Sequence, residues 1–273
     1  MSIIQVIFGR FSQNGLQTNH KNAGFFSCCS VLLHLIVEFY NLNHRLPNII
    51  DTSESFNWYK PKGKEEQDIF LDFFLPNRDI QIPFSNPILF EQSYQFRSFH
   101  EIQLQTIAPF IRKYFCPSPR IQTIVRTIKT KYNCFLDNME ENICVLFFRG
   151  NDKKTECVLP VYSMYIEQAK QLLKQHPSLI FLIQSDETEF IETMLQEFPT
   201  NSFYFKDEIR HINHTNTSVD IIDKEKNTNY YFSQHFLSIT IIMSQAKYVV
   251  CNLGNCSLWI ALFRGNSENI ILL

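Results

Sequence analysis

The C-terminal half of the chain alternates between short, largely apolar runs and longer stretches in which apolar residues recur every three or four positions. The short runs have the length of buried strands and lie at 143–149, 179–184, 202–205, 248–251 and 270–273. The longer stretches have the period of helices and lie at 161–175, 188–198, 233–244 and 255–263. This alternation predicts an α/β fold with a parallel, doubly wound sheet.

The N-terminal half is less regular. The run at 3–8 predicts a first buried strand, the polar residues at 12–22 predict turns, and the largely apolar run at 25–40 predicts a helix. A second strand is expected at 46–50, followed by an irregular segment at 51–66.

Two amphipathic helices are expected before the middle of the chain, at 101–115 and 119–132. The polar residues 137–142 suit a domain junction, and 273 residues suit two modest domains. We therefore expect one domain at 1–140 and a second at 141–273.

Composition narrows the class of protein. A hydrophobic content of 45%, a charged content of 19% and a net charge of −2 describe a globular protein and argue against a nucleic-acid coat.

Neither a secretory signal nor an apolar run of membrane-spanning length is evident, so a cytoplasmic location without a membrane span is expected. The eight cysteines include no Cys-x-x-Cys pair, which disfavours zinc ribbons and redox pairs. The abundance of Phe and scarcity of Gly are typical of an AT-rich genome, such as that of a virus or a protist.

The most informative stretch is Cys144-Val-Leu-Phe-Phe-Arg149-Gly-Asn-Asp152-Lys153-Lys-Thr-Glu156, where an apolar run stops at an arginine and a cluster of charges. Ligands of open α/β sheets bind beyond the carboxyl ends of the strands. A guanidinium at such an end suits bidentate capture of phosphate. The stretch therefore predicts an anionic, phosphorylated ligand; the alternative is a surface ion-pair cluster.

The second polar strand end is Gln184-Ser185-Asp186-Glu187. In a parallel sheet it converges with the first. Asp186 and Glu187 would either bind ribose hydroxyls or cap the helix that follows.

The third is Asn252-Leu-Gly254-Asn255-Cys256-Ser257, directly before a helix. Gly254 permits a tight turn, and the backbone N–H groups of Asn255, Cys256 and Ser257 would form an anion site at the helix start. The alternative is a capped helix without a ligand.

The absence of several well-known motifs disfavours common enzyme classes, namely nucleotide hydrolases, dehydrogenases, serine hydrolases and zinc proteases. No P-loop, Gly-x-Gly-x-x-Gly, Gly-x-Ser-x-Gly or His-Glu-x-x-His motif occurs. His211 and His214 lie in a polar segment without a spaced carboxylate partner, and His34 and His235 are expected to be structural. No acidic pair or His/Cys cluster has the spacing of a metal site, so no metal is expected.

In order, these segments resemble the fucosyltransferase superfamily that includes α1,6-, α1,2- and protein O-fucosyltransferases. Phe147-Phe-Arg149-Gly-Asn-Asp152-Lys153 is similar to the family's His-x-Arg-(Arg)-x-Asp-Lys block, whose arginine grips the GDP pyrophosphate. Ile183-Gln-Ser185-Asp186-Glu187 is similar to its Thr-Asp-Asp segment, which is associated with the nucleoside.

The last two matches are Met243-Ser-Gln-Ala-Lys-Tyr-Val-Val-Cys-Asn252 and Gly24-Phe-Phe-Ser-Cys. The former is similar to a Ser-Gln-Ala-Asp-Phe-Leu-Val-Cys-Thr strand that leads into a phosphate-binding turn, and the latter to a Gly-Tyr-Gly-Cys helix start. The chain departs from the family where Phe147 replaces the histidine, Gly150 a second arginine found in some members, and Ile239 an aspartate.

The resemblance implies two Rossmann-like domains facing a cleft, the GT-B arrangement, with the donor in the C-terminal domain. It implies metal-independent, inverting transfer of fucose from GDP-fucose to a hydroxyl of a glycan or protein acceptor, with no cofactor. Arg149, Lys153 and the N–H groups at 255–257 would stabilise the departing GDP. Glu156 is the expected general base, and Asp152 would orient Arg149 or Lys153.

Two other classes stay open from sequence. One is a non-catalytic sugar-nucleotide or glycan-binding protein on the same fold, which the loss of the histidine and of the second arginine supports. The other is a nucleotide-binding α/β domain of unrelated function.

Overall fold

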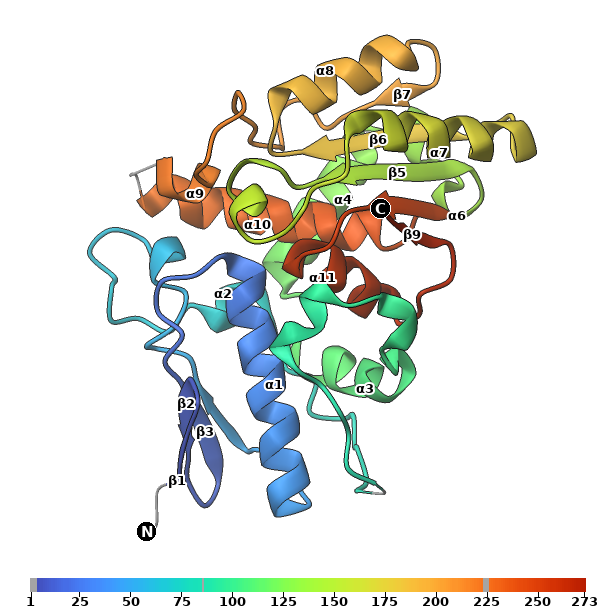
Figure 1. The fold of residues 1–273 in the computed structure, drawn as a ribbon. Coiled ribbons are helices and arrows are strands. Elements are labelled where there is room, and N and C mark those ends of the chain that lie inside the picture. Colours follow the sequence, from blue (N-terminus) through green and yellow to red (C-terminus); the bar gives the residue numbers. More distant parts are fainter. Residues whose placement is uncertain (1–3, 85, 223–225) are drawn as a thin grey trace.

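The computed structural model describes residues 4–84, 86–222 and 226–273, which form an α/β protein with two sheets (Figure 1). The N-terminal half contains β1 Ile4–Val6, β2 Gly9–Phe11, β3 Gly15–Thr18, α1 Phe25–Asn43, β4 Ile49–Asp51, η1 Asn57–Tyr59, α2 Phe70–Phe73, η2 Gln92–Phe96, η3 Phe99–Glu101, α3 Leu104–Tyr114, α4 Pro119–Lys131, α5 Asn133–Leu136 and α6 Met139–Asn142. The C-terminal half contains β5 Ile143–Phe148, η4 Asn151–Thr155, α7 Tyr162–Gln175, β6 Ile180–Ser185, α8 Thr188–Glu197, β7 Ser202–Phe203, α9 Val219–Ile222, α10 Lys226–Met243, β8 Tyr248–Cys251, α11 Asn255–Arg264 and β9 Ile270–Leu272.

The C-terminal sheet confirms the predicted parallel, doubly wound arrangement. Its strand order is β7-β6-β5-β8-β9, and all the pairings are parallel. Every residue of β5 is buried, as expected for the central strand of a sheet covered on both faces. Because Phe147 aligns with Gln184 of β6 and Cys251 of β8, the three polar strand ends meet at one edge.

Helices cover both faces of this sheet (Figure 1). α7 and α8 lie on the outer face, whereas α10 and α11 lie between the sheet and the N-terminal half. α10 packs against α4, and α11 packs against α1 and α3, so the two halves share an apolar interface. α10 begins at Lys226, before the helix predicted from residue 233, because packing against α4 and η1 outweighs the polar composition of the added turns.

The N-terminal sheet differs from the expected Rossmann-like pattern. β1, β2 and β3 form an antiparallel meander, and β4 joins β3 in parallel. The prediction of a buried first strand is wrong, because Ile4 is 56% exposed at the edge of this sheet. β3 lies within the segment predicted as turns. Its sequence, Gly-Leu-Gln-Thr, has only one large apolar residue, so it lacks the apolar pattern that predicts a core strand.

The predicted helix at 25–40 is α1, the longest described helix. It has 19 residues and a mean hydropathy of 1.6 in its most apolar window, so it is long and apolar enough to cross a membrane. By length and composition alone, the expectation that the chain has no apolar run of membrane-spanning length is therefore wrong. Within this fold 72% of that window is buried, which is the burial of a core helix.

The two amphipathic helices form as predicted, as α3 and α4. Ser118 caps α4, since its side-chain oxygen accepts a hydrogen bond from Ile121 N at 3.4 Å, and Pro119 occupies the first helical position. This local chemistry explains why Cys116-Pro-Ser-Pro119 separates the helices.

Candidate functional site

Arg149 lies just beyond β5, and its backbone is fixed by the neighbouring strand end. Arg149 N donates to Asn252 Oδ1 at 2.9 Å, and Asn252 Nδ2 donates to Arg149 O at 2.9 Å. The buried Asn252 side chain therefore continues the ladder between β5 and β8 by one step.

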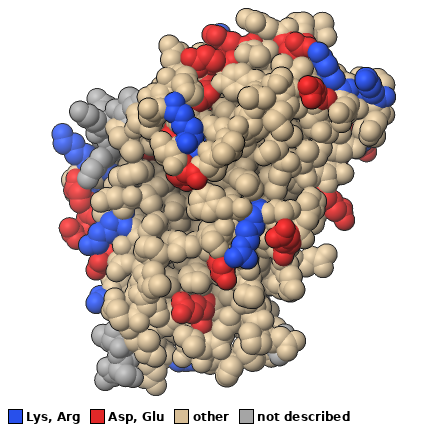
Figure 2. Space-filling model, in the orientation of Figure 1, with Lys and Arg blue, Asp and Glu red and all other residues tan. Residues whose placement is uncertain are grey.

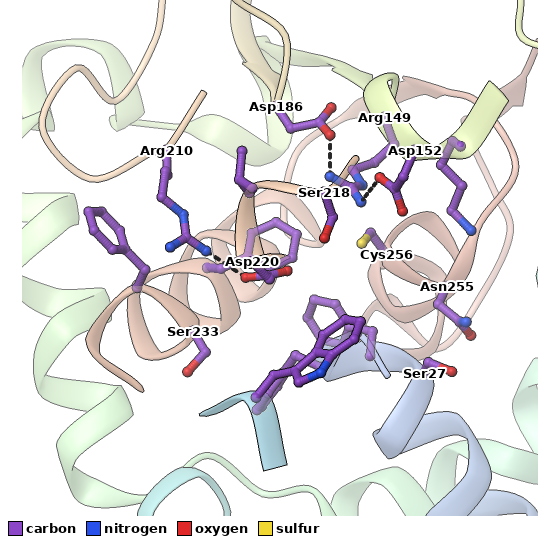
Figure 3. Close-up of a pocket in the computed structure, with 18 of the residues that line it drawn as sticks. Ser27, Arg149, Asp152, Asp186, Arg210, Ser218, Asp220, Ser233, Asn255 and Cys256 are labelled. Atoms are coloured by element: carbon purple, nitrogen blue, oxygen red, sulfur yellow. Dashed lines mark hydrogen bonds and ion pairs between the residues drawn. The ribbon is translucent and has the colours of Figure 1, made fainter. Parts of the chain in front are cut away.

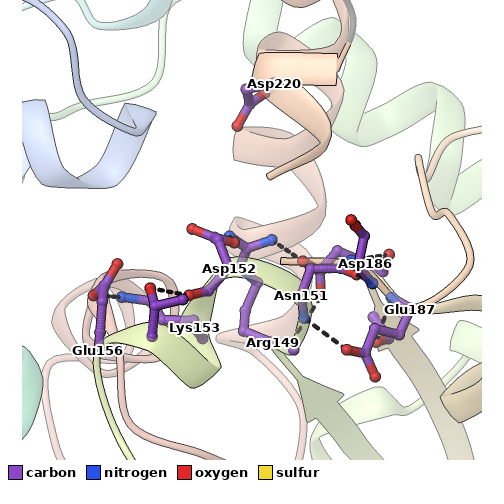
Figure 4. Close-up of polar contacts among 12 residues, drawn as sticks. Arg149, Asn151, Asp152, Lys153, Glu156, Asp186, Glu187 and Asp220 are labelled. Atoms are coloured by element: carbon purple, nitrogen blue, oxygen red, sulfur yellow. Dashed lines mark hydrogen bonds and ion pairs between the residues drawn. The ribbon is translucent and has the colours of Figure 1, made fainter. Parts of the chain in front are cut away.

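The guanidinium of Arg149 lies between two carboxylates (Figure 4). Nη1 pairs with Asp186, at the end of β6, and Nη2 lies 3.1 Å from Asp152 Oδ1. Burial acts to lower the pKa of Arg149, but the neighbouring acids, Asp186 foremost, raise it overall. Arg149 is therefore a permanent cation whose buried Nε has no hydrogen-bond partner among the described residues.

The pKa of Asp152 is raised, because its carboxylate is partly withdrawn from water. Burial raises its pKa, the charge of Arg149 lowers it, and the charge of Asp186 raises it again, with a net rise. Asp152 also lines the pocket described below. It therefore combines contact with Arg149, as predicted, with the properties of a proton acceptor.

Glu187 lies beneath the Arg149 loop and not in the pocket. Its carboxylate accepts hydrogen bonds from Asn151 N at 2.6 Å and Tyr162 Oη at 2.5 Å, and it pairs with His214 Nδ1 at 2.8 Å. These partners leave little capacity for a ribose hydroxyl. Glu187 therefore positions the Arg149 loop from outside the pocket lining, and its role in donor binding stays a prediction. His214 has a carboxylate partner that its sequence neighbours do not reveal.

The close packing of Glu187 against the loop explains why position 150 is a glycine. A Cβ atom at position 150 would lie 2.1 Å from Glu187 Oε1 and 2.7 Å from Phe148 Cε1. In this arrangement the loop has no room for a side chain at position 150.

Lys153 projects from η4 and is held by contacts from both halves. Its Nζ lies 2.5 Å from Glu156 Oε2 and 3.5 Å from Gln95 Oε1 of η2. Its side chain is only 9% exposed, whereas that of Glu156 is 40% exposed. Glu156 is therefore placed as a partner of Lys153 at the rim of the site.

The start of α11 faces Lys153. Gly254 has a φ of 149°, and a Cβ there would lie 3.3 Å from Lys153 Cε, so both backbone and space require glycine. The first intrahelical bond runs from Leu258 N to Gly254 O at 3.0 Å. The N–H groups of residues 255–257 consequently have no acceptor within the helix and carry its partial positive charge.

The side chains at this helix start have separate tasks. Asn255 accepts a hydrogen bond from Ser30 Oγ at 2.7 Å and donates to Gln95 Oε1 at 2.9 Å, which ties α11 to the N-terminal half. Ser257 Oγ donates to Asn252 O at 2.6 Å. Burial raises the pKa of Cys256 to about 11, against the lowering effect of Arg149. The thiol is therefore neutral near pH 7.

A pocket of about 350 Å³ opens between these groups and the N-terminal half (Figure 3). This volume is within the usual range for small-molecule sites. The pocket is lined by predicted residues, namely Arg149, Asp152, Lys153, Glu156, Asp186, Asn255 and Cys256, and also by Gly24, Phe25, Phe26, Trp58, Tyr59 and Gln95 from the N-terminal half. Of the predicted residues, Gly254, Ser257 and Glu187 are not part of this lining.

A second charged cluster, which no sequence motif predicted, also lines this pocket. Arg210 Nη2 lies 2.5 Å from Asp220 Oδ1, and Arg210 Nη1 donates to Asn229 Oδ1 at 2.7 Å. Tyr59 Oη donates to Asp220 Oδ2 at 3.2 Å. These residues come from segments without a periodic apolar pattern and lie far apart in the sequence, so no sequence motif indicated the cluster.

Acidic side chains outnumber basic ones around the pocket. Among the described lining residues the basic ones are Arg149, Lys153 and Arg210, and the acidic ones are Asp152, Glu156, Asp186, Glu208 and Asp220. Over the face shown in Figure 2 charges of both signs are scattered. Any anion bound here is therefore held by directed hydrogen bonds to Arg149, Lys153 and backbone N–H groups, since the overall field does not favour it.

The described residues contain no group of three or more His, Cys, Asp or Glu side chains placed to hold a metal ion. Comparison with known proteins adds no family: no protein-family model matches the chain, and no curated protein matches it.

Proposed function

We propose that the pocket binds a nucleotide sugar and that the protein is a glycosyltransferase, specifically one that transfers fucose from GDP-fucose to a hydroxyl of a glycan or protein. One observation carries the proposal: Arg149 and Lys153 line one pocket at the carboxyl edge of a parallel sheet, together with Asn255 and Cys256, whose N–H groups have no acceptor within α11. This is the place and the donor chemistry expected for a diphosphate. The resemblance of the surrounding motifs supplies the identity of the donor and the GT-B arrangement of domains 1–140 and 141–273.

In this proposal the leaving group is GDP. Cleavage of the sugar–phosphate bond places negative charge on the β-phosphate, and donors already fixed in the site stabilise it without reorganisation. Arg149 and Lys153 are suited to this because both are largely buried and held by neighbours. Their cationic charge takes the part that a metal ion plays in other transferases.

The acceptor hydroxyl must lose a proton as it attacks. Glu156 lies in the pocket lining, but its exposed carboxylate is paired with Lys153. Asp152 also lines the pocket and has a raised pKa, which suits proton uptake near neutral pH better than an ordinary carboxylate does. Asp152 is therefore the second candidate base beside Glu156.

The test is release of GDP from GDP-fucose, with and without candidate acceptors and in the presence of excess chelator. The proposal expects slow GDP release that is insensitive to chelator and falls by at least roughly tenfold in Arg149→Lys, which keeps the charge but loses the planar fork. Arg126→Lys, on the exposed face of α4, is the matched control. A strict requirement for manganese or magnesium would contradict metal-independent transfer.

The second candidate function is non-catalytic binding of a sugar nucleotide or glycan. It is favoured by the pre-existing pairing of Arg149 with Asp186 and Asp152 and by the surplus of carboxylates, whose oxygens accept hydrogen bonds from sugar hydroxyls. Binding of GDP-fucose without any release of GDP would favour this candidate over the enzyme.

A further inference from the structure

Two buried side-chain oxygen atoms of the pocket lining have no hydrogen-bond partner within the part of the chain that the structure describes. Ser218 Oγ and Gln184 Oε1 each have no partner among the described residues, although both side chains are at least 95% buried. Both residues line the pocket, and Figure 3 shows Ser218 between Arg149 and Asp220. Buried polar groups are nearly always satisfied, so these two atoms indicate a ligand that carries hydroxyl groups.

Beyond Ser218 lies the cluster of Arg210 and Asp220, which presents hydrogen-bond donors and acceptors side by side (Figure 3). A carboxylate has about four lone-pair sites, and among the described residues Arg210 and Tyr59 are the two that donate to the Asp220 carboxylate. Asp220 therefore has capacity to accept from a ligand. The charge of Asp220 also contributes to the raised pKa of Arg149, so the Asp220 end and the Arg149 end of the pocket lie close enough to interact.

The walls next to this cluster are apolar. Val219, Phe236 and Ile239 line the pocket, and the guanidinium of Arg210 lies 4.9 Å from the ring centre of Phe232. A flat aromatic ring would be buried against these side chains while its polar edge faces Arg210 and Asp220. Ile239 supplies a wall and no hydrogen bond, so base recognition must come from elsewhere in the pocket.

We infer that this end of the pocket is a guanosine subsite, in which Asp220 and Arg210 recognise guanine and Ser218 and Gln184 bind the ribose hydroxyls. Guanine is the common base that offers a carboxylate two adjacent N–H groups, N1–H and the N2 amine, with the O6 acceptor beside them for an arginine. Adenine and cytosine each place a ring-nitrogen acceptor next to their amine, and uracil flanks its single N–H with two carbonyls. The inference rests on the proposed function, because the diphosphate at Arg149 fixes the direction of the nucleotide.

The experiment measures binding of GDP, IDP and ADP to the full chain by isothermal titration calorimetry. IDP differs from GDP only by lacking the N2 amine, so we expect IDP to bind roughly tenfold more weakly and ADP more weakly still. Asp220→Asn should abolish the preference for GDP over IDP. Asp207→Asn, an exposed acid on the same segment, is the matched control and should preserve the preference.

Ser218→Ala separates ribose from base recognition, since it should weaken GDP and IDP by the same factor. Wild-type protein that binds GDP and IDP equally, or an Asp220→Asn variant that keeps the GDP preference, overturns the guanine assignment while leaving the proposed function standing. Failure of the wild-type protein to bind any of the three nucleotides overturns the proposed function as well. The wild-type ratio is decisive even if a variant does not fold.

Discussion

Arg149 and Asn252 hold each other by two reciprocal hydrogen bonds, each 2.9 Å long, between the backbone of one and the side chain of the other. Asn252→Ala would leave a buried N–H and C=O at Arg149 without partners. We expect a loss of about 1–3 kcal/mol in the free energy of unfolding, measured by urea denaturation, and weaker GDP binding. Asn43→Ala, at the exposed end of α1, should change neither quantity. Unchanged stability in Asn252→Ala would contradict this positioning role.

Gly150→Ala should destabilise the protein, because the new Cβ would meet Glu187 Oε1 at 2.1 Å. Overpacking of this kind costs about 1–3 kcal/mol, measurable as a lower urea midpoint. Gly24→Ala is the control, since nothing lies within 4 Å of a Cβ placed there. Equal midpoints for the two variants would show that the loop is free to move away from Glu187.

Two isosteric variants, Asp152→Asn and Glu156→Gln, distinguish between Asp152 and Glu156 as the general base. If Asp152 is the base, Asp152→Asn should lower turnover by roughly 10²–10⁴-fold, whereas Glu156→Gln should leave turnover near normal. Because burial raises the pKa of Asp152, wild-type turnover should rise with pH through a value above that of an ordinary aspartate. The opposite pattern, with the large loss in Glu156→Gln, would restore Glu156 as the base. Near-normal turnover in both would leave water or the departing phosphate as proton acceptor.

The free energy of unfolding should fall in mild acid because of partly buried histidines. Burial lowers the pKa of His235, as it does that of His20 and His211, below the usual 6.5. As the pH falls below about 6.5, the unfolded chain binds protons that the folded chain does not, so the free energy of unfolding decreases. His235→Gln should make this decrease shallower in urea denaturation between pH 5 and 8. An identical pH slope in the variant would show that His235 does not contribute.

The sequence predicted the C-terminal sheet and part of the site because both follow from simple patterns. A continuous apolar run as short as 143–148, ended by Arg149 and Gly150, is typical of a strand buried on both faces, and parallel pairing then brings Arg149, Asp186 and the start of α11 together.

The remaining features depend on tertiary contacts. Asp186 and Glu187 are adjacent in sequence, but one carboxylate pairs with Arg149 and the other lies below its loop, which no periodicity specifies. Arg210 and Asp220 meet only because the loop after β7 folds back over α10 and reaches Tyr59. The sequence did not predict the meander of β1, β2 and β3 because these strands have only three or four residues each, too few for a periodic pattern.

The central claim, that Arg149 binds the diphosphate of GDP, is tested most directly by calorimetric titration of GDP into the wild-type protein, Arg149→Lys and Arg126→Lys. Arg149→Lys keeps a cation beside the buried Asp186, so the fold need not accommodate an unpaired carboxylate. The account predicts that GDP binds the wild-type protein and Arg126→Lys equally, and Arg149→Lys at least roughly tenfold more weakly. Equal affinity in all three proteins, or no binding by the wild-type protein, would contradict it.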